Sequence, residues 1–327
     1  MDYLRGLKGY LFPCIVNLIC RTRYTRHGKM VCSMENQPTV EKESKVPRRV
    51  RKVMPPQIVW PLLFTLGNLV AGFAAIHYAT KSAEWVGPWG WSGLTMAGSM
   101  VFLGMFLDSV DGAVARLTKS VTELGAMLDS LADLVTCGVA PAMMVLALVG
   151  SYLGEDGHLT VLGPDADMPW GKVVWAIAAV YVCCTALRLA RFNVETQPEE
   201  GPTDDIAFLG IPSPGAAGVV VALIMLHQHL LANGIDTVWI GQAYAFGVPI
   251  VALSCALAMV SNMPYDHFVS RYLGRPQSFR FLSVTVIIIF FGIWWFQETV
   301  AFGFVWYALT GPIAEIKKHR QSQKELQ

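Results

Sequence analysis

Four aspartates lie close together in a chain that is otherwise strongly apolar. They are Asp108, Asp111, Asp129 and Asp133. On helices, the three-residue spacing of the first pair and the four-residue spacing of the second each place two carboxylates on one face. A turn between the helices would bring the two pairs together. Carboxylates this close repel one another unless cations bind them, and a ligand set made only of oxygen favours Mg²⁺, Mn²⁺ or Ca²⁺ over zinc.

Small and polar residues lie between the two pairs. Gly112, Ala115 and Gly125 leave room for a diphosphate or a flat ligand to approach the backbone. Arg116 supplies a cation for phosphate oxygens, and Thr122 can donate a hydrogen bond to the same group. Two divalent ions held by carboxylates can clamp a diphosphate, and a carboxylate at the edge of the cluster can take a proton from an attacking hydroxyl. The pattern therefore indicates phosphoryl transfer from a diphosphate.

Structural roles compete with these functional ones. A single aspartate near a helix end commonly caps the helix, but capping does not account for four aspartates at helical spacing around glycines and an arginine. Gly112 and Gly125 also suit close helix packing in a membrane, and the two roles are compatible. For Thr122, a purely structural role explains the residue as well as a ligand contact does.

The composition identifies an integral membrane protein. Of 327 residues, 54% are hydrophobic and 15% are charged, which is too apolar for an ordinary soluble domain. The seven cysteines include no CxxC pair, so no disulfide framework or zinc knuckle is indicated.

Eight apolar segments are long enough to cross a bilayer core of about 30 Å. They lie at 58–80, 91–117, 124–152, 170–192, 207–231, 238–262, 281–297 and 299–315. We therefore expect an all-α polytopic helical bundle with eight crossings, of which the last two could instead form one re-entrant pair.

Charges outside these segments predict their orientation. Residues 42–52, the loop 263–280 and the tail 316–327 are basic, whereas the loop 153–168 holds four acids and no lysine or arginine. Basic stretches stay preferentially in the cytoplasm. The four aspartates are therefore expected at the cytoplasmic ends of the second and third crossings.

The sequence from Asp108 to Asp133 resembles the signature of the CDP-alcohol phosphatidyltransferase family. Every fixed position of its pattern, Asp-x2-Asp-Gly-x2-Ala-Arg-x8-Gly-x3-Asp-x3-Asp, is present. The resemblance implies a six-helix membrane core that binds a CDP-linked lipid and two divalent ions, Mg²⁺ or Mn²⁺, at the cytoplasmic face. It also implies attack of an alcohol hydroxyl on the β-phosphate, release of CMP, and a homodimer.

The resemblance implies a role for each matching position. The four aspartates would hold the metal ions, and Asp133 would also act as the general base. The positions implied to bind the CDP-lipid are Gly112, Ala115, Arg116, Thr122 and Gly125 of the signature, with Thr65 and Asn68 of the first crossing.

The resemblance, the apolar segments and the charges together divide the chain into four parts. The family core covers residues 58–262, and the C-terminal transmembrane helices cover 263–315. A basic cytoplasmic tail at 316–327 follows them. Residues 1–57 form a basic N-terminal extension that is expected to be cytoplasmic and partly disordered, unless translation begins at Met30 or Met34.

Stretches outside the signature resemble the branch of the family that uses L-serine. They are 65–75, 128–142, 186–193, 208–218 and 256–265. They imply CDP-diacylglycerol as the donor and L-serine as the acceptor. The carboxylate of serine needs a cation, which Arg188 or Arg191 could supply, although Arg188 could equally anchor the helix end to lipid phosphates. Glycerol 3-phosphate, an inositol phosphate and choline remain alternative acceptors, although the acidic loop 199–205 disfavours a phosphorylated one.

Two other classes of membrane protein explain the acids less well. A divalent-cation transporter binds its ions near the midplane on broken helices, whereas these acids lie at one face on one helical hairpin. A structural scaffold gives no reason for four acids. The expected function is phosphatidyl transfer from CDP-diacylglycerol to L-serine by a multi-pass protein of the inner or plasma membrane. Its partners would be membrane lipids and no nucleic acid.

Overall fold

The computed structural model describes residues 56–118, 122–153, 162–195, 210–235, 238–261 and 294–325. Within these ranges the secondary structure is helical, apart from turns and one isolated bridge between Val86 and Ser92. The predictions for the N-terminal extension up to residue 55, the loop 199–205 and the loop 263–280 fall outside the described residues.

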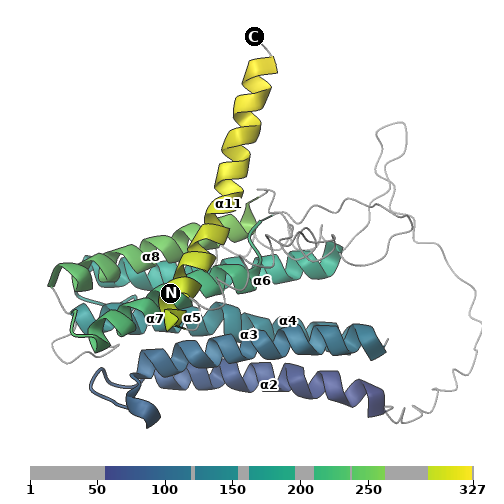
Figure 1. Cartoon of the computed structure of the whole chain (residues 1–327), viewed down its shortest axis with the longest axis horizontal. Helices are drawn as coiled ribbons and strands as arrows, with labels where there is room; N and C mark the ends of the chain where they lie inside the picture. The colour runs from purple at the N-terminus through teal and green to yellow at the C-terminus, as the bar shows by residue number, and fades with distance from the viewer. Residues whose placement is uncertain are drawn as a thin grey trace, which may run out of the picture. The chain divides into compact units, whose positions relative to one another are not determined.

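Eight α-helices are described, with a short 3₁₀-helix at Pro88–Gly90 and a π-helix, η3, at Leu134–Val139 (Figure 1). The α-helices are α2 Pro56–Ala79, α3 Gly93–Thr118, α4 Glu123–Asp133, α5 Ala140–Leu153, α6 Pro169–Glu195, α7 Ser213–Ala232, α8 Val238–Val260 and α11 Phe296–Glu325.

Within the described part of the chain, six helical segments are long and apolar enough to cross a membrane. They are α2, α3, the continuous segment from α4 through η3 to α5, α6, α7 and α8. The expectation of an all-α polytopic membrane protein is therefore confirmed. The two further crossings predicted after residue 262 stay a prediction, because most of the first lies outside the described residues. α11 is not among the six, and it continues to Glu325 through the predicted tail.

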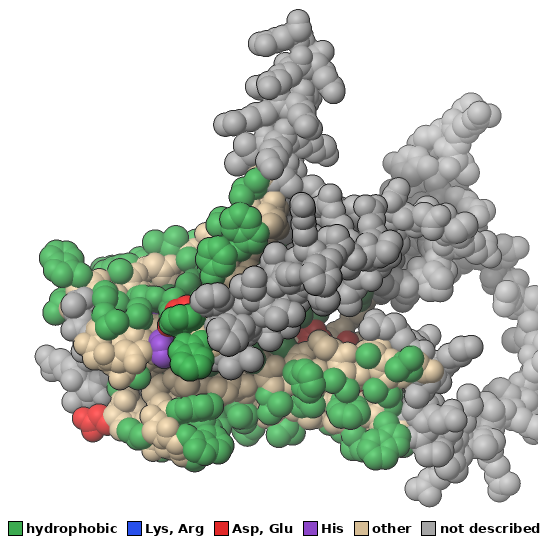
Figure 2. All heavy atoms as spheres, in the orientation of Figure 1, with side chains coloured by type: hydrophobic (Ala, Val, Ile, Leu, Met, Phe, Trp, Pro, Cys, Tyr) green, Lys and Arg blue, Asp and Glu red, His purple; other side chains and the backbone are tan. Residues whose placement is uncertain are grey.

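The core lies around α5 and α7. Met144 and Leu148 of α5 and Val220 and Ile224 of α7 are completely buried. Outward-facing side chains are also large and apolar, as Phe73 shows with 70% exposure. Figure 2 shows hydrophobic side chains over the visible faces of α2, α3 and α11. An apolar exterior of this kind suits contact with lipid.

The π-helix lets three helices approach closely just after Asp133. Its widened turn is visible in the bond from the Ala140 amide to the carbonyl of Val135, five residues earlier. Thr136, completely buried, donates from Oγ1 to the Asn68 carbonyl on α2 at 3.1 Å. A Cβ at Gly104 of α3 would lie 2.7 Å from the Thr136 methyl group. Glycine is therefore required at this contact between α2, α3 and η3.

Candidate active site

Three of the predicted carboxylates meet between α3 and α4. Asp108 and Asp111 come from the last turns of α3, and Asp129 comes from α4. One oxygen from each lies within 4.8 Å of the others. The structure therefore brings together both helices of the predicted hairpin. Asp133 lies one helical turn beyond Asp129 and is outside this three-residue group.

The first helix of the core holds two of the aspartates in place. Thr65 Oγ1 donates to Asp111 Oδ2 at 2.7 Å, and Asn68 Nδ2 donates to Asp133 Oδ1 at 3.1 Å. All four residues are buried. The family resemblance implied that Thr65 and Asn68 bind the CDP-lipid, which stays a prediction, and their hydrogen bonds to the aspartates were not foreseen. Their spacing of three residues on α2 is the signal that they share a face.

The donor set fits a hard divalent cation. Asp129 Oδ1 is buried and has no hydrogen-bond partner among the described residues. A buried carboxylate oxygen without a donor is costly. One oxygen of the Asp129 carboxylate lies within 4.8 Å of oxygens of Asp108 and Asp111, and Mg²⁺ and Mn²⁺ prefer oxygen ligands of this type. The residues present thus match the divalent-metal chemistry expected of the site.

Gly112 and Thr122 have different surroundings near this cluster. Among the described residues, a Cβ at Gly112 would meet nothing within 4 Å, so they leave open space beside Asp111. Thr122 is the N-cap of α4, where its Oγ1 accepts a hydrogen bond from the Gly125 amide at 3.0 Å. The structural role considered for Thr122 is therefore present. Its hydroxyl proton is not used in that bond, so a ligand contact stays compatible with it.

For two predicted ligand-binding residues the structure describes the backbone only. Ala115 and Arg116 lie in the last turns of α3, and their side chains are outside the described part of the structure. Their roles toward the diphosphate stay predictions.

Arg188 of α6 also lies near the aspartates. Its Nη1 donates to Ser213 Oγ at the first residue of α7, at 2.9 Å. The guanidinium also interacts electrostatically with Asp133. Its Nε is buried and has no hydrogen-bond partner within the described ranges. Arg191, half-buried, lies about one turn further along α6.

A second polar contact joins α4 to α6 near the cluster. Asn193 Nδ2 donates to Ser130 Oγ at 2.9 Å, next to Asp129 in the sequence. Neither Ser213 nor this pair was singled out from the sequence, although Ser213 and Asn193 lie in stretches that carry the family resemblance. The site is thus assembled from α2, α3, α4, α6 and the start of α7.

Known proteins share this core. Proteins named CDP-diacylglycerol–serine O-phosphatidyltransferase match it in several organisms. The one from Helicobacter pylori strain J99 is 33% identical over 215 residues, covering 65% of this chain and 74% of the relative. The one from Bacillus subtilis strain 168 is 33% identical over 222 residues, covering 67% and 97%. The one from Methanocaldococcus jannaschii is 32% identical over 173 residues, covering 53% and 65%.

A family model agrees with these matches. The model described as CDP-alcohol phosphatidyltransferase covers residues 58–260, which include the helices that contribute to the aspartate site apart from the first two residues of α2. With a matching range of this length and with the aspartates gathered as the reaction requires, the chain belongs to the CDP-alcohol phosphatidyltransferase family.

Proposed function

We propose that this protein transfers the phosphatidyl group of CDP-diacylglycerol to the hydroxyl of L-serine, giving phosphatidylserine and CMP. Family membership supplies the reaction class. The observation that carries the choice of acceptor is the position of Arg188, a cation that faces Asp133 beside the carboxylate cluster. The names of the relatives support the same acceptor.

The proposed reaction is a direct displacement at phosphorus. The serine hydroxyl oxygen attacks the phosphorus of the phosphatidyl group, and the bond from that phosphorus to the bridging oxygen breaks. The bridging oxygen keeps the electron pair and leaves with CMP. Asp133 takes the hydroxyl proton, as a general base must lie close to the proton that it removes. The hydrogen bond from Asn68 orients the Asp133 carboxylate for this task.

The carboxylates are proposed to bind two divalent ions, Mg²⁺ or Mn²⁺. Asp108, Asp111 and Asp129 would hold them together with Asp133. When bound, such ions neutralise charge on the diphosphate and on the leaving phosphate. Thr65 fixes the orientation of Asp111 through a 2.7 Å hydrogen bond, so this ligand is positioned before substrate binds.

Arg188 is proposed to bind the carboxylate of serine. A guanidinium can make two parallel hydrogen bonds to a carboxylate. Nη1 of Arg188 is held by Ser213, which leaves the buried Nε edge available for a ligand. Arg191 would provide a further positive charge nearer the end of α6.

The proposal includes a location and an assembly. The open space beside Gly112 would receive the diphosphate, and the acyl chains would remain among membrane lipids. The basic loop and tail favour a cytoplasmic site, because lysine and arginine concentrate on that side of membranes. The membrane would be the inner or plasma membrane, and the enzyme is proposed to act as a homodimer.

Incorporation of labelled L-serine into lipid tests the proposal. Purified protein in vesicles would receive CDP-diacylglycerol and Mg²⁺ or Mn²⁺, with Asp129→Ala as the inactive control. We expect incorporation that depends on CDP-diacylglycerol, on the ion and on Asp129. Release of CMP only with glycerol 3-phosphate, an inositol phosphate or choline would replace serine as the acceptor. No product with any of these alcohols would overturn the proposed activity.

A further inference from the structure

α11 packs against α7, although it lies outside residues 58–260 that match the family model. A Cβ at Gly218 would collide with the ring of Phe304, and a Cβ at Gly215 would lie 2.9 Å from Cε1 of Tyr307. Two aromatic side chains of α11, one turn apart, therefore rest directly on two glycines of α7. Close contact of this kind depends on the absence of a side chain at both positions.

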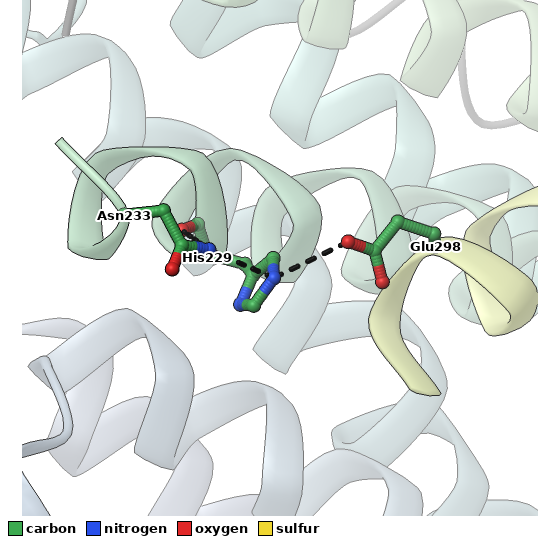
Figure 3. A network of polar contacts seen from close by, with 3 residues as sticks. All are labelled: His229, Asn233 and Glu298. Atoms are coloured by element: carbon green, nitrogen blue, oxygen red, sulfur yellow. Dashed lines mark hydrogen bonds and ion pairs between the residues drawn. The ribbon is translucent and has the colours of Figure 1, made fainter. Parts of the chain in front are cut away.

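A polar contact holds the other end of the same helix pair. Nε2 of His229, near the end of α7, lies 3.2 Å from Oε1 of Glu298 in the first turn of α11 (Figure 3). Asn233 lies beside His229, and its side chain donates to the His229 carbonyl at 3.0 Å. α11 is thus fixed to α7 at three levels, and its register on α7 is defined.

That register brings Tyr307 to the start of α7, where Arg188 is also held. Tyr307 lies on Gly215, and Ser213, two residues earlier, accepts the hydrogen bond from Arg188. Tyr307 and Asp133 both lie close enough to Arg188 for their ionisable groups to interact with it electrostatically. Arg188 is thus near both Asp133 of the core and Tyr307 of α11.

We propose that Tyr307 positions Arg188 and forms one wall of the acceptor pocket. By this arrangement α11 helps to select the acceptor alcohol, although it lies outside the matched family core. The inference rests on the proposed function, because it assigns Arg188 to the carboxylate of serine. Tyr307 has two parts with separate effects: the ring packs on Gly215 of α7, and the hydroxyl is the part that can hydrogen-bond to a guanidinium or a ligand.

Tyr307→Phe separates the two parts, because it keeps the ring on Gly215 and removes the hydroxyl. We expect the KM for serine to rise about tenfold, as for loss of a hydrogen-bonding group beside a charged side chain. The KM for CDP-diacylglycerol and the kcat should stay close to the wild-type values. Trp306→Phe is the matched control, because the neighbouring Trp306 is 60% exposed. Its kinetics should not change.

Gly215→Ala tests the same contact from α7. The new methyl group would displace the Tyr307 ring, so the KM for serine should rise while the protein still folds. Gly303→Ala on α11 is its control, since a Cβ there would meet nothing within 4 Å. A double variant with Arg188→Lys should change the KM by less than the product of the two single effects, as is found for residues that act together.

The outcomes separate this inference from the proposed function. If wild-type protein uses serine but Tyr307→Phe leaves its KM unchanged, α11 only supports the bundle and the inference is wrong. Equal increases in the KM of both substrates would also contradict it. If wild-type protein uses another alcohol, the proposed acceptor fails, and the same variants measured with that alcohol show whether Tyr307 shapes its pocket.

Discussion

Asn68 on α2 donates a hydrogen bond to Asp133 on α4, with 3.1 Å between Nδ2 and Oδ1. Asn68 has no exposed surface, and Asp133 is 9% exposed. The carbonyl of Asn68 meanwhile accepts from Thr136 in the π-helix that follows Asp133. One residue outside the aspartate signature thus fixes both the carboxylate and the backbone turn next to it.

Asn68→Ala should reduce the kcat far more than it changes either KM. The variant leaves Asp133 near its place but removes the donor that orients it. Because general base catalysis contributes about 10²–10⁴-fold, we expect the kcat to fall by about 10²-fold. Val70→Ala, on the exposed face of the same helix, should keep full activity. A kcat of Asn68→Ala close to wild type would show that Asp133 needs no such support.

Asp129→Asn should abolish stabilisation of the protein by divalent ions. In wild-type protein at an ion concentration of 100 times Kd, binding adds about 2.7 kcal/mol to the free energy of unfolding. The Tm in detergent, measured with Mg²⁺ or Mn²⁺ and again with a chelator, reports this difference. Without ions the variant should be at least as stable as wild type, because it removes one of three mutually repelling carboxylates. An equal ion-dependent rise in both proteins would place the ions elsewhere.

Two glycines of α3 should respond to alanine in opposite ways. At Gly112 a Cβ meets open space, so Gly112→Ala should fold normally and raise the KM for CDP-diacylglycerol. At Gly104 a Cβ would lie 2.7 Å from both the Asn68 side chain and the Thr136 methyl group. Gly104→Ala should therefore lower the free energy of unfolding by ~1–3 kcal/mol. Thermal unfolding and initial rates on both variants distinguish a ligand space from a packing contact.

Arg188→Ala should weaken serine binding much more than Arg191→Ala does. Arg188 is held at Ser213 and faces Asp133, whereas Arg191 lies about one turn further along α6. Loss of a charged hydrogen-bonding partner predicts a KM for serine at least about tenfold higher. The KM for CDP-diacylglycerol measured in parallel provides the reference. Equal effects on both substrates would assign Arg188 to the diphosphate or to general structure.

Much of the fold was predictable from the apolar segments. The segment predicted at 170–192 is α6 at Pro169–Glu195, and that at 238–262 is α8 at Val238–Val260. Long, uniformly apolar stretches define such helices because few other structures satisfy backbone groups in lipid. The spacing, with a turn between two consecutive helices, predicted that the two pairs of aspartates would meet. Asp108, Asp111 and Asp129 do so, whereas Asp133 lies outside that group.

Contacts between distant helices were not predictable in the same way. The hydrogen bonds of Thr65 and Asn68 to Asp111 and Asp133 depend on how α2 rotates about its axis. An apolar helix in lipid gives little indication of that rotation, because both of its faces are hydrophobic. The contact of Tyr307 with Gly215 depends likewise on the register between α7 and α11.

The π-helix at Leu134–Val139 changes the angular alignment of residues in α4 with residues in α5. A turn closed over five residues takes up one residue more than an α-helical turn closed over four. A helical wheel drawn at a constant angle through 123–153 therefore misaligns Asp129 and Asp133 against the face of α5 by one position, or about 100°. Loss of a single residue within 134–139 would leave both flanking helices aligned and remove the bulge that carries Thr136 between α2 and α3. A one-residue deletion within 134–139 would therefore keep the carboxylates turned toward the site. The same deletion elsewhere in this continuous helix would rotate them away from it.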